Sequence, residues 1–201
     1  PVLKMAAVYG ANGAGKSNLL KGINFLKAIA LNKNFLDKES IGRYIFALKE
    51  NAGAEPLELT IEFVTKSGIP FIYSVEVINT GIIFETLQIS GLGTEENRNV
   101  FTRRLGKVEY AVTPSDEVNN MVLGWIEKNP FASLLTINND MPVLTDPNIG
   151  IAHKWFEDEL TIIGLHSFNP ALIGIFKSNY EINQFALELF RVIDLGIDEV
   201  K

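Results

Sequence analysis

The sequence predicts an α/β fold, in which a glycine-rich loop and its helix are followed by an antiparallel β-meander and a helical subdomain. Three observations predict it: a glycine-rich string before an apolar helical period, an alternating period over residues 57–112, and helical spacing after residue 113. We expect residues 1–112 to form the lobe that carries the loop, and residues 113–201 to form a mostly helical part that leads to a further lobe.

Composition limits the classes of protein that this chain can represent. With 201 residues, 47% of them hydrophobic, it can bury a core of its own. The net charge of −6 gives no overall basic field of the kind that nucleic acid attracts. The absence of cysteine excludes disulfides and thiolate metal sites and fits a reducing cytoplasm, where we expect the protein. No apolar run of about 18 residues exists, so we expect no membrane span.

The most specific motif is G-x-x-x-x-G-K-S, which runs from Gly10 to Ser17. An apolar segment that begins at Leu3 precedes it, and an amphipathic helix follows it to about Leu31, which is the setting of a phosphate-binding P-loop. Glycines let the backbone approach a polyphosphate and turn its N–H groups inward. The start of the helix near Lys16 adds the positive end of the helix dipole. The string therefore predicts a nucleotide site.

Each position of the loop has an expected role, with ATP and Mg²⁺ as the cofactors. Lys16 is the catalytic candidate because its ammonium can neutralise the β/γ-phosphates, and the Ser17 hydroxyl is the candidate Mg²⁺ ligand. We expect Tyr9 to pack under the loop rather than to stack on adenine. The triplet from Asn32 to Asn34 lacks the Asp of a guanine-reading motif. The expected nucleotide-binding residues are Gly10, Asn12, Gly13, Ala14, Gly15, Lys16, Ser17 and Asn18.

A period of two residues predicts a run of strands after this helix. Because tight turns join consecutive strands, the strands must be antiparallel neighbours. Arg103 and Arg104, near the end of the fourth strand, are interpreted as a solvated strand end. The expected strands span residues 57–64, 71–78, 83–89, 99–104 and 107–112, the last two around a turn at Leu105-Gly106.

Helical spacing dominates the last third, with expected helices at residues 115–126, 152–163 and 182–195 and a short apolar segment at 131–137. Trp125 and Trp155 lie in apolar stripes and are assigned to the core. His153 and His166 have no carboxylate at ligand spacing, so we expect packing or surface roles for both. The acidic run from Glu157 to Glu159 is interpreted as a solvated helix face.

A catalytic carboxylate is missing from the positions where a P-loop ATPase needs one, at the end of a second core strand. The nearest matches are Glu85, which lies inside the meander, and Asp194, which lies in a helical pattern. Three interpretations remain: the first lobe of an ATPase whose catalytic half is encoded downstream, a small P-loop kinase that acts alone, and a nucleotide-gated interaction module without turnover. The meander favours the first, and we expect the chain to be a fragment that hydrolyses ATP only with its other half.

A family resemblance points the same way. The string from Gly10 to Leu20 resembles the Walker A motif of the SMC/RecF branch of ABC-type ATPases. It is closer to prokaryotic AAA-fifteen ATP/GTP-binding proteins, which are related to overcoming-lysogenisation-defect nucleases and abortive-infection phage-defence ATPases. Trp155-Phe156 and the string from Asp194 to Glu199 extend the likeness.

The resemblance implies a lobe that is completed by a second lobe and by a head-to-head homodimer around the nucleotide. It also implies an effector protein or DNA as a further partner, in phage defence or DNA transactions. A family Q-loop would fall near Asn138 or Asn139, where we interpret the sequence as an ordinary loop.

Overall fold

The computed structural model describes residues 8–11, 13–32, 35 and 56–163, with isolated residues between 174 and 188. The chain divides into two compact units, Pro1–Ile162 and Ile163–Lys201, and the regular elements described below belong to the first. The elements are α1 (Lys16–Leu31), β1 (Leu57–Val64), β2 (Pro70–Ile78), β3 (Gly81–Ile89), β4 (Arg98–Arg104), β5 (Lys107–Tyr110), α3 (Asp116–Lys128), α4 (Leu134–Asp140), α5 (Pro147–Lys154) and the π-helix η2 (Trp155–Glu159). This arrangement confirms the predicted α/β fold.

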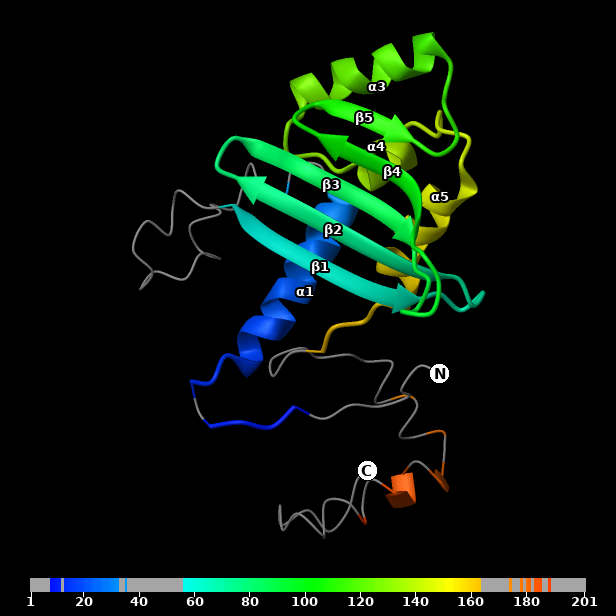
Figure 1. The fold of residues 1–201 in the computed structure, drawn as a ribbon. Coiled ribbons are helices and arrows are strands. Elements are labelled where there is room, and N and C mark those ends of the chain that lie inside the picture. Colours follow the sequence, from blue (N-terminus) through cyan, green and yellow to red (C-terminus); the bar gives the residue numbers. More distant parts are fainter. Residues whose placement is uncertain are drawn as a thin grey trace. The chain divides into compact units, whose positions relative to one another are not determined.

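The five strands form one antiparallel sheet in the order β1-β2-β3-β4-β5, so the predicted meander is confirmed (Figure 1). The strand ends agree with the predicted ones to within two residues. At the β4–β5 turn, Leu105 and Gly106 have φ values of 47° and 79°. Two consecutive residues with positive φ make the type I′ turn that a two-residue hairpin favours.

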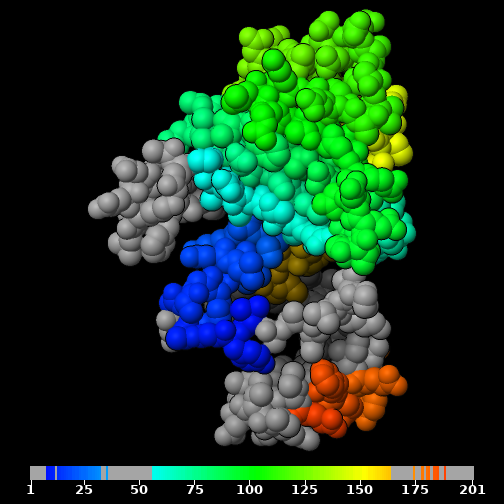
Figure 2. Space-filling view, viewed as in Figure 1, coloured from blue at the N-terminus to red at the C-terminus, as the bar shows by residue number. Residues whose placement is uncertain are grey.

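Alternation along the strands gives the sheet one buried and one open face. Polar side chains such as Glu58, Thr60 and Glu62 alternate with the apolar positions of β1 and lie on the open face. In Figures 1 and 2 this open face is turned toward the viewer, and α1 runs behind the sheet. The buried face contributes Phe63, Phe71, Tyr73, Val75, Val77, Leu87 and Phe101 to the core.

Helices α1 and η2 close the core over the buried face. Helix α1 buries Phe25, Leu26, Ile29 and Ala30, which share one side of its last turns. In η2 the ring of Trp155 stacks on Phe63 with centroids 3.9 Å apart, and Phe156 makes edge contacts with Phe63 and Tyr73. Trp125 and Trp155 are partly buried and pack against the core, so their predicted core role is confirmed.

Side-chain caps fix where the later helices begin. Ser115, Ser133 and Asp146 accept hydrogen bonds from the first amides of α3, α4 and α5. The predicted helix at 152–163 is wrong in its bounds, because Asp146 and Pro147 start α5 earlier and η2 ends at Glu159. The loop predicted at Asn138 and Asn139 is also wrong, since both belong to α4.

Several predicted features lie outside the described residues or are not tested by them. The helix at 182–195 is described only at isolated residues, and Asp194 and His166 lie outside the described part. The division between residues 112 and 113 stays a prediction. Within the described ranges, no helix combines the length and the apolar character needed to span a lipid bilayer.

Arg103 is buried, with 1% of its surface exposed, so its predicted place at a solvated strand end is wrong. Its Nη1 donates to the Ala132 carbonyl at 2.7 Å and its Nη2 to the Pro130 carbonyl at 3.1 Å. Successive strand residues point to opposite faces, so Arg103 points inward and its neighbour Arg104 outward. Arg104 is exposed, as predicted, and lies over the Phe84 ring at 4.7 Å.

Glu85 lies beside Arg103 and is fully buried. Both of its oxygens accept from the Leu134 amide, at 2.9 and 3.0 Å, and one also accepts from the Tyr73 hydroxyl at 3.0 Å. The Arg103 Nη1 is 3.5 Å from Glu85 Oε2. Burial raises the pKa of Glu85, and Arg103, the Leu134 amide and Tyr73 each act against that rise. These contacts fix the start of α4 on the sheet.

Gly81 and Gly124 give a matched test of how closely β3 packs against Pro130, in the loop before α4. A Cβ on Gly81, at φ 148°, would lie 2.8 Å from Pro130 Cβ, whereas one on Gly124 in α3 meets nothing within 4 Å. We expect Gly81→Ala to lower the free energy of unfolding by about 1–3 kcal/mol. Gly124→Ala should raise it by about 0.5–1 kcal/mol. Urea denaturation measures both, and shifts of the same sign would contradict this packing.

The adjacent arginines give a second matched test. Arg103→Met removes the partner of a buried carboxylate, so we expect a loss of roughly 3–5 kcal/mol in unfolding free energy. Arg104→Met removes an exposed contact and should cost about 1 kcal/mol or less. Adding Glu85→Gln to Arg103→Met should recover part of the loss, because the unpaired charge is then gone. Equal losses from the two single variants in urea denaturation would show that the buried pair adds nothing.

Candidate functional site

The predicted P-loop forms a tight turn directly before α1. Gly13 and Gly15 have φ values of 84° and 87°, in the left-handed region that side chains disfavour. The amide of Ala14 donates to the Ala11 carbonyl at 3.2 Å, which closes the turn. A Cβ on Gly13 or Gly15 would meet nothing within 4 Å. The glycines are therefore needed for the left-handed backbone conformation of the loop, and the space beside them is open.

The start of α1 suits an anion. Its N-cap is Gly15, no side chain caps it, and its first turn holds no acidic residue. Helices α3, α4 and α5, by contrast, each begin with a capping side chain. The first amides of a helix have no acceptor within the helix, and they point toward the positive end of its dipole. In the sequence, no acidic residue precedes Asp37, so the local charge also favours a phosphate.

Lys16 folds back across the loop. Its Nζ donates to the carbonyl oxygens of Gly10 at 2.5 Å and Ala11 at 2.7 Å. A Cβ on Gly10 would lie within 4.0 Å of the Lys16 side chain. The ammonium thus lies within the turn of the loop, where its partners are neutral carbonyls. Phosphate oxygens would be stronger partners, because they carry negative charge that the neutral carbonyl oxygens lack.

The other predicted site residues lie around the same turn. Ser17 and Asn18 are exposed in the first turn of α1, and the Asn18 amide donates to the Gly15 carbonyl at 2.9 Å. Ala14 is exposed in the loop, and Asn12 lies outside the described residues. The turn thus brings the Lys16 side chain to the Gly10 carbonyl, and Ser17 follows Lys16 in the first turn of α1. Their roles toward a nucleotide stay predictions.

The segment before the loop is described only at its end, and that end differs from the expectation. Val8 and Tyr9 belong to no strand, and Tyr9 is 91% exposed, so its predicted packing under the loop is wrong. A P-loop strand is normally buried by parallel neighbours. All the strands within the described residues instead belong to the antiparallel meander. Residues 1–7 lie outside the described part of the chain.

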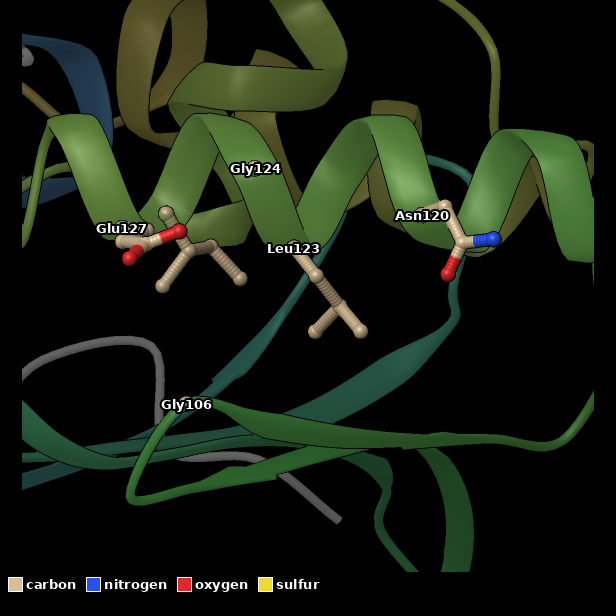
Figure 3. A pocket seen from close by; sticks show the side chains of 6 residues that line it. Gly106, Asn120, Leu123, Gly124 and Glu127 are labelled. Carbon is tan, nitrogen blue, oxygen red and sulfur yellow. The ribbon is translucent and has the colours of Figure 1, made fainter.

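Two surface hollows lie away from the loop. One, of about 500 Å³, lies between α3 and the β4–β5 turn (Figure 3) and is lined by Gly106, Asn120, Leu123, Gly124, Ile126 and Glu127. A smaller one, of about 350 Å³, is lined by Thr102, Arg104, Leu105, Lys107 and Glu109. Neither contains a residue of the P-loop. Backbone amides on a surface turn are enough to hold a phosphate, so the predicted role of the loop does not depend on either hollow.

His153 is buried and packs inside the molecule, which is one of the two roles expected of it. Burial lowers the pKa of His153, although Glu157, whose Oε2 is 3.9 Å from Nδ1, acts against that change. Glu157 and Asp158 are exposed, and Glu159 accepts from the Lys66 amide at 2.8 Å. In the part of the chain that the structure describes, no group of three His, Asp or Glu side chains is placed to hold a metal ion.

Comparison with known families shows which family the chain belongs to. Residues 5–182 match the family described as "AAA domain, putative AbiEii toxin, Type IV TA system". The chain belongs to this family. This AAA domain is a nucleotide-binding P-loop ATPase domain, and its antiparallel sheet with helices fits that class. Neither the curated proteins nor the solved structures gave a match to it.

Proposed function

We propose that this AAA domain binds ATP with Mg²⁺ at the loop from Gly10 to Ser17, as the nucleotide-binding lobe of an ABC/SMC-like ATPase. The observation that carries the proposal is the Lys16 ammonium, held within a turn made by two left-handed glycines at an uncapped helix start. In this role Lys16 neutralises phosphate charge and the Ser17 hydroxyl ligates Mg²⁺. The amides from Gly13 to Ser17 hold the phosphates.

Hydrolysis would need groups from outside the described residues. Glu85, the nearest match to a catalytic carboxylate, is fully buried and is already bound by Arg103, Tyr73 and the Leu134 amide. Beside the loop, Leu19 and Leu20 of α1 are 55% and 48% exposed. An exposed apolar surface next to a nucleotide site suits a further packing partner. We therefore propose that a second lobe and a second protomer, in a head-to-head dimer, complete the catalytic site.

The biological setting is proposed from the family description, which names a toxin and a type IV toxin–antitoxin system. Phage defence by abortive infection, or a DNA transaction of the SMC/RecF kind, would use the nucleotide state to control an effector protein or DNA. The alternative of a kinase that acts alone has less support. Arg103, one of the two clustered arginines that such an enzyme would use on phosphates, is buried in a structural network.

Removal of the Lys16 ammonium tests the nucleotide site. We expect Lys16→Ala to weaken binding of ATP with Mg²⁺ by about 100-fold or more, through the loss of charge-assisted hydrogen bonds. Lys21→Ala is the matched control, because Lys21 is exposed on the same helix. Isothermal titration calorimetry measures both variants. Unchanged affinity in Lys16→Ala would refute the proposed site.

A second experiment tests the dependence of hydrolysis on other groups. We expect the purified segment 1–201 to release negligible phosphate from ATP, because the first turn of α1 holds no acidic residue and Glu85 is bound in the buried network. A phosphate-release assay with and without Mg²⁺ measures this. Turnover that requires Mg²⁺ and disappears in Lys16→Ala would show that the segment is a complete ATPase.

A further inference from the structure

Helix α1 is anchored by its second half. Phe25, Leu26, Ile29 and Ala30 are buried, whereas most of its first two turns are exposed. Within the described residues, α1 packs mainly on α4, η2 and β1, and Lys27 Nζ donates to the Leu160 carbonyl at 2.6 Å. The P-loop therefore lies at the exposed end of a helix whose other end is held.

Two hydroxyls hold that other end. Ser133 Oγ donates to the Ile29 carbonyl at 3.0 Å, and Thr136 Oγ1 donates to the Ala30 carbonyl at 2.9 Å. The last carbonyls of a helix have no donor within the helix, so these two hydroxyls supply what α1 itself lacks. Ser133 and Thr136, which we call the clasp, are themselves buried.

The clasp also belongs to the start of α4. Ser133 Oγ accepts from the Thr136 amide at 3.1 Å, as the N-cap of that helix. The positive end of the α4 dipole thus faces the negative end of α1, which is a favourable arrangement. Glu85 holds the next amide, that of Leu134, and Arg103 holds the carbonyl of Ala132 just before the clasp. Through these contacts the clasp ties α1 to the sheet.

We propose that Ser133 and Thr136 are positioning residues for the phosphate site, because they keep α1 helical up to the loop. This inference rests on the proposed ATP site. A helix of about 15 residues is marginal alone in water, and α1, with 16 residues, depends on tertiary contacts for its order. Without the clasp, two buried carbonyls lose their donors and the helix frays more often. The amides of the first turn of α1 are then ordered in a smaller fraction of the molecules. The apparent ATP affinity falls in proportion to that fraction.

Three variants of the full chain that contains residues 1–201 test the proposal by titration with ATP and Mg²⁺. Thr136→Val keeps the shape and removes the hydroxyl, and we expect about three- to tenfold weaker binding. Thr136→Ser keeps the hydroxyl and should stay within about twofold of the parent. Val122→Ala removes buried volume from α3 and should leave ATP affinity unchanged although it lowers stability. Parent-like affinity in Thr136→Val, or an equal loss in Val122→Ala, would overturn the proposal.

Hydrogen exchange in the unmodified chain keeps the proposal testable should Thr136→Val not fold. If ATP binding depends on the clasp, linkage requires that bound ATP in turn stabilises the clasp and slows hydrogen exchange there. We expect ATP to slow exchange in α1 and in residues 134–140 of α4, and to leave the β4–β5 hairpin unchanged. Protection confined to residues 10–20 would overturn the role of the clasp.

The Lys16→Ala variant, titrated in parallel, separates the two proposals. If Lys16→Ala abolishes binding while Thr136→Val retains it, the ATP site stands and the clasp proposal fails. If Lys16→Ala binds ATP as the parent does, the proposed function itself fails.

Discussion

The start of α4 is the point on which the other described elements depend. There the Glu85 carboxylate, from β3, binds the Leu134 amide, and Arg103, from β4, binds the carbonyls of the loop before α4. A buried charge that loses its partner is strongly destabilising, so the strands, this loop and the helix must come together. The hydroxyl of Ser133 then joins the same point to the last turn of α1.

The last turn of α1 lies at this point and its first turn lies at the P-loop. The two ends of the helix differ in what they require from their surroundings. The buried end needs close packing and donors for its carbonyls, which α4 supplies. The exposed end keeps its amides uncapped and its glycines in left-handed conformations, which suits a phosphate. The same helix thus serves stability at one end and anion binding at the other, and the clasp links the two.

The meander and the P-loop motif could be predicted because their signals are local: alternation sets strands, and phosphate chemistry restricts residue types at fixed spacing. The predicted exposure of Arg103 is wrong because it rests on the place of the residue near a strand end, whereas alternation from Phe101 puts Arg103 on the buried face. Its partner Glu85 is 18 residues away, and the clasp joins residues more than 100 apart. Such contacts depend on tertiary packing that single-sequence periodicity does not encode. Asp146 and Pro147 are a local signal for the start of α5, which the predicted helix at 152–163 does not include.

The central claim is that the amides from Gly13 to Ser17 receive the phosphates of ATP. Backbone NMR of the isotopically labelled chain, titrated with ATP and Mg²⁺, tests it most directly. The account predicts the largest amide shift changes at residues 13–17, with little change at Gly106 and Gly124, which line the hollow beside α3. Changes centred on that hollow, with residues 13–17 unaffected, would contradict the account.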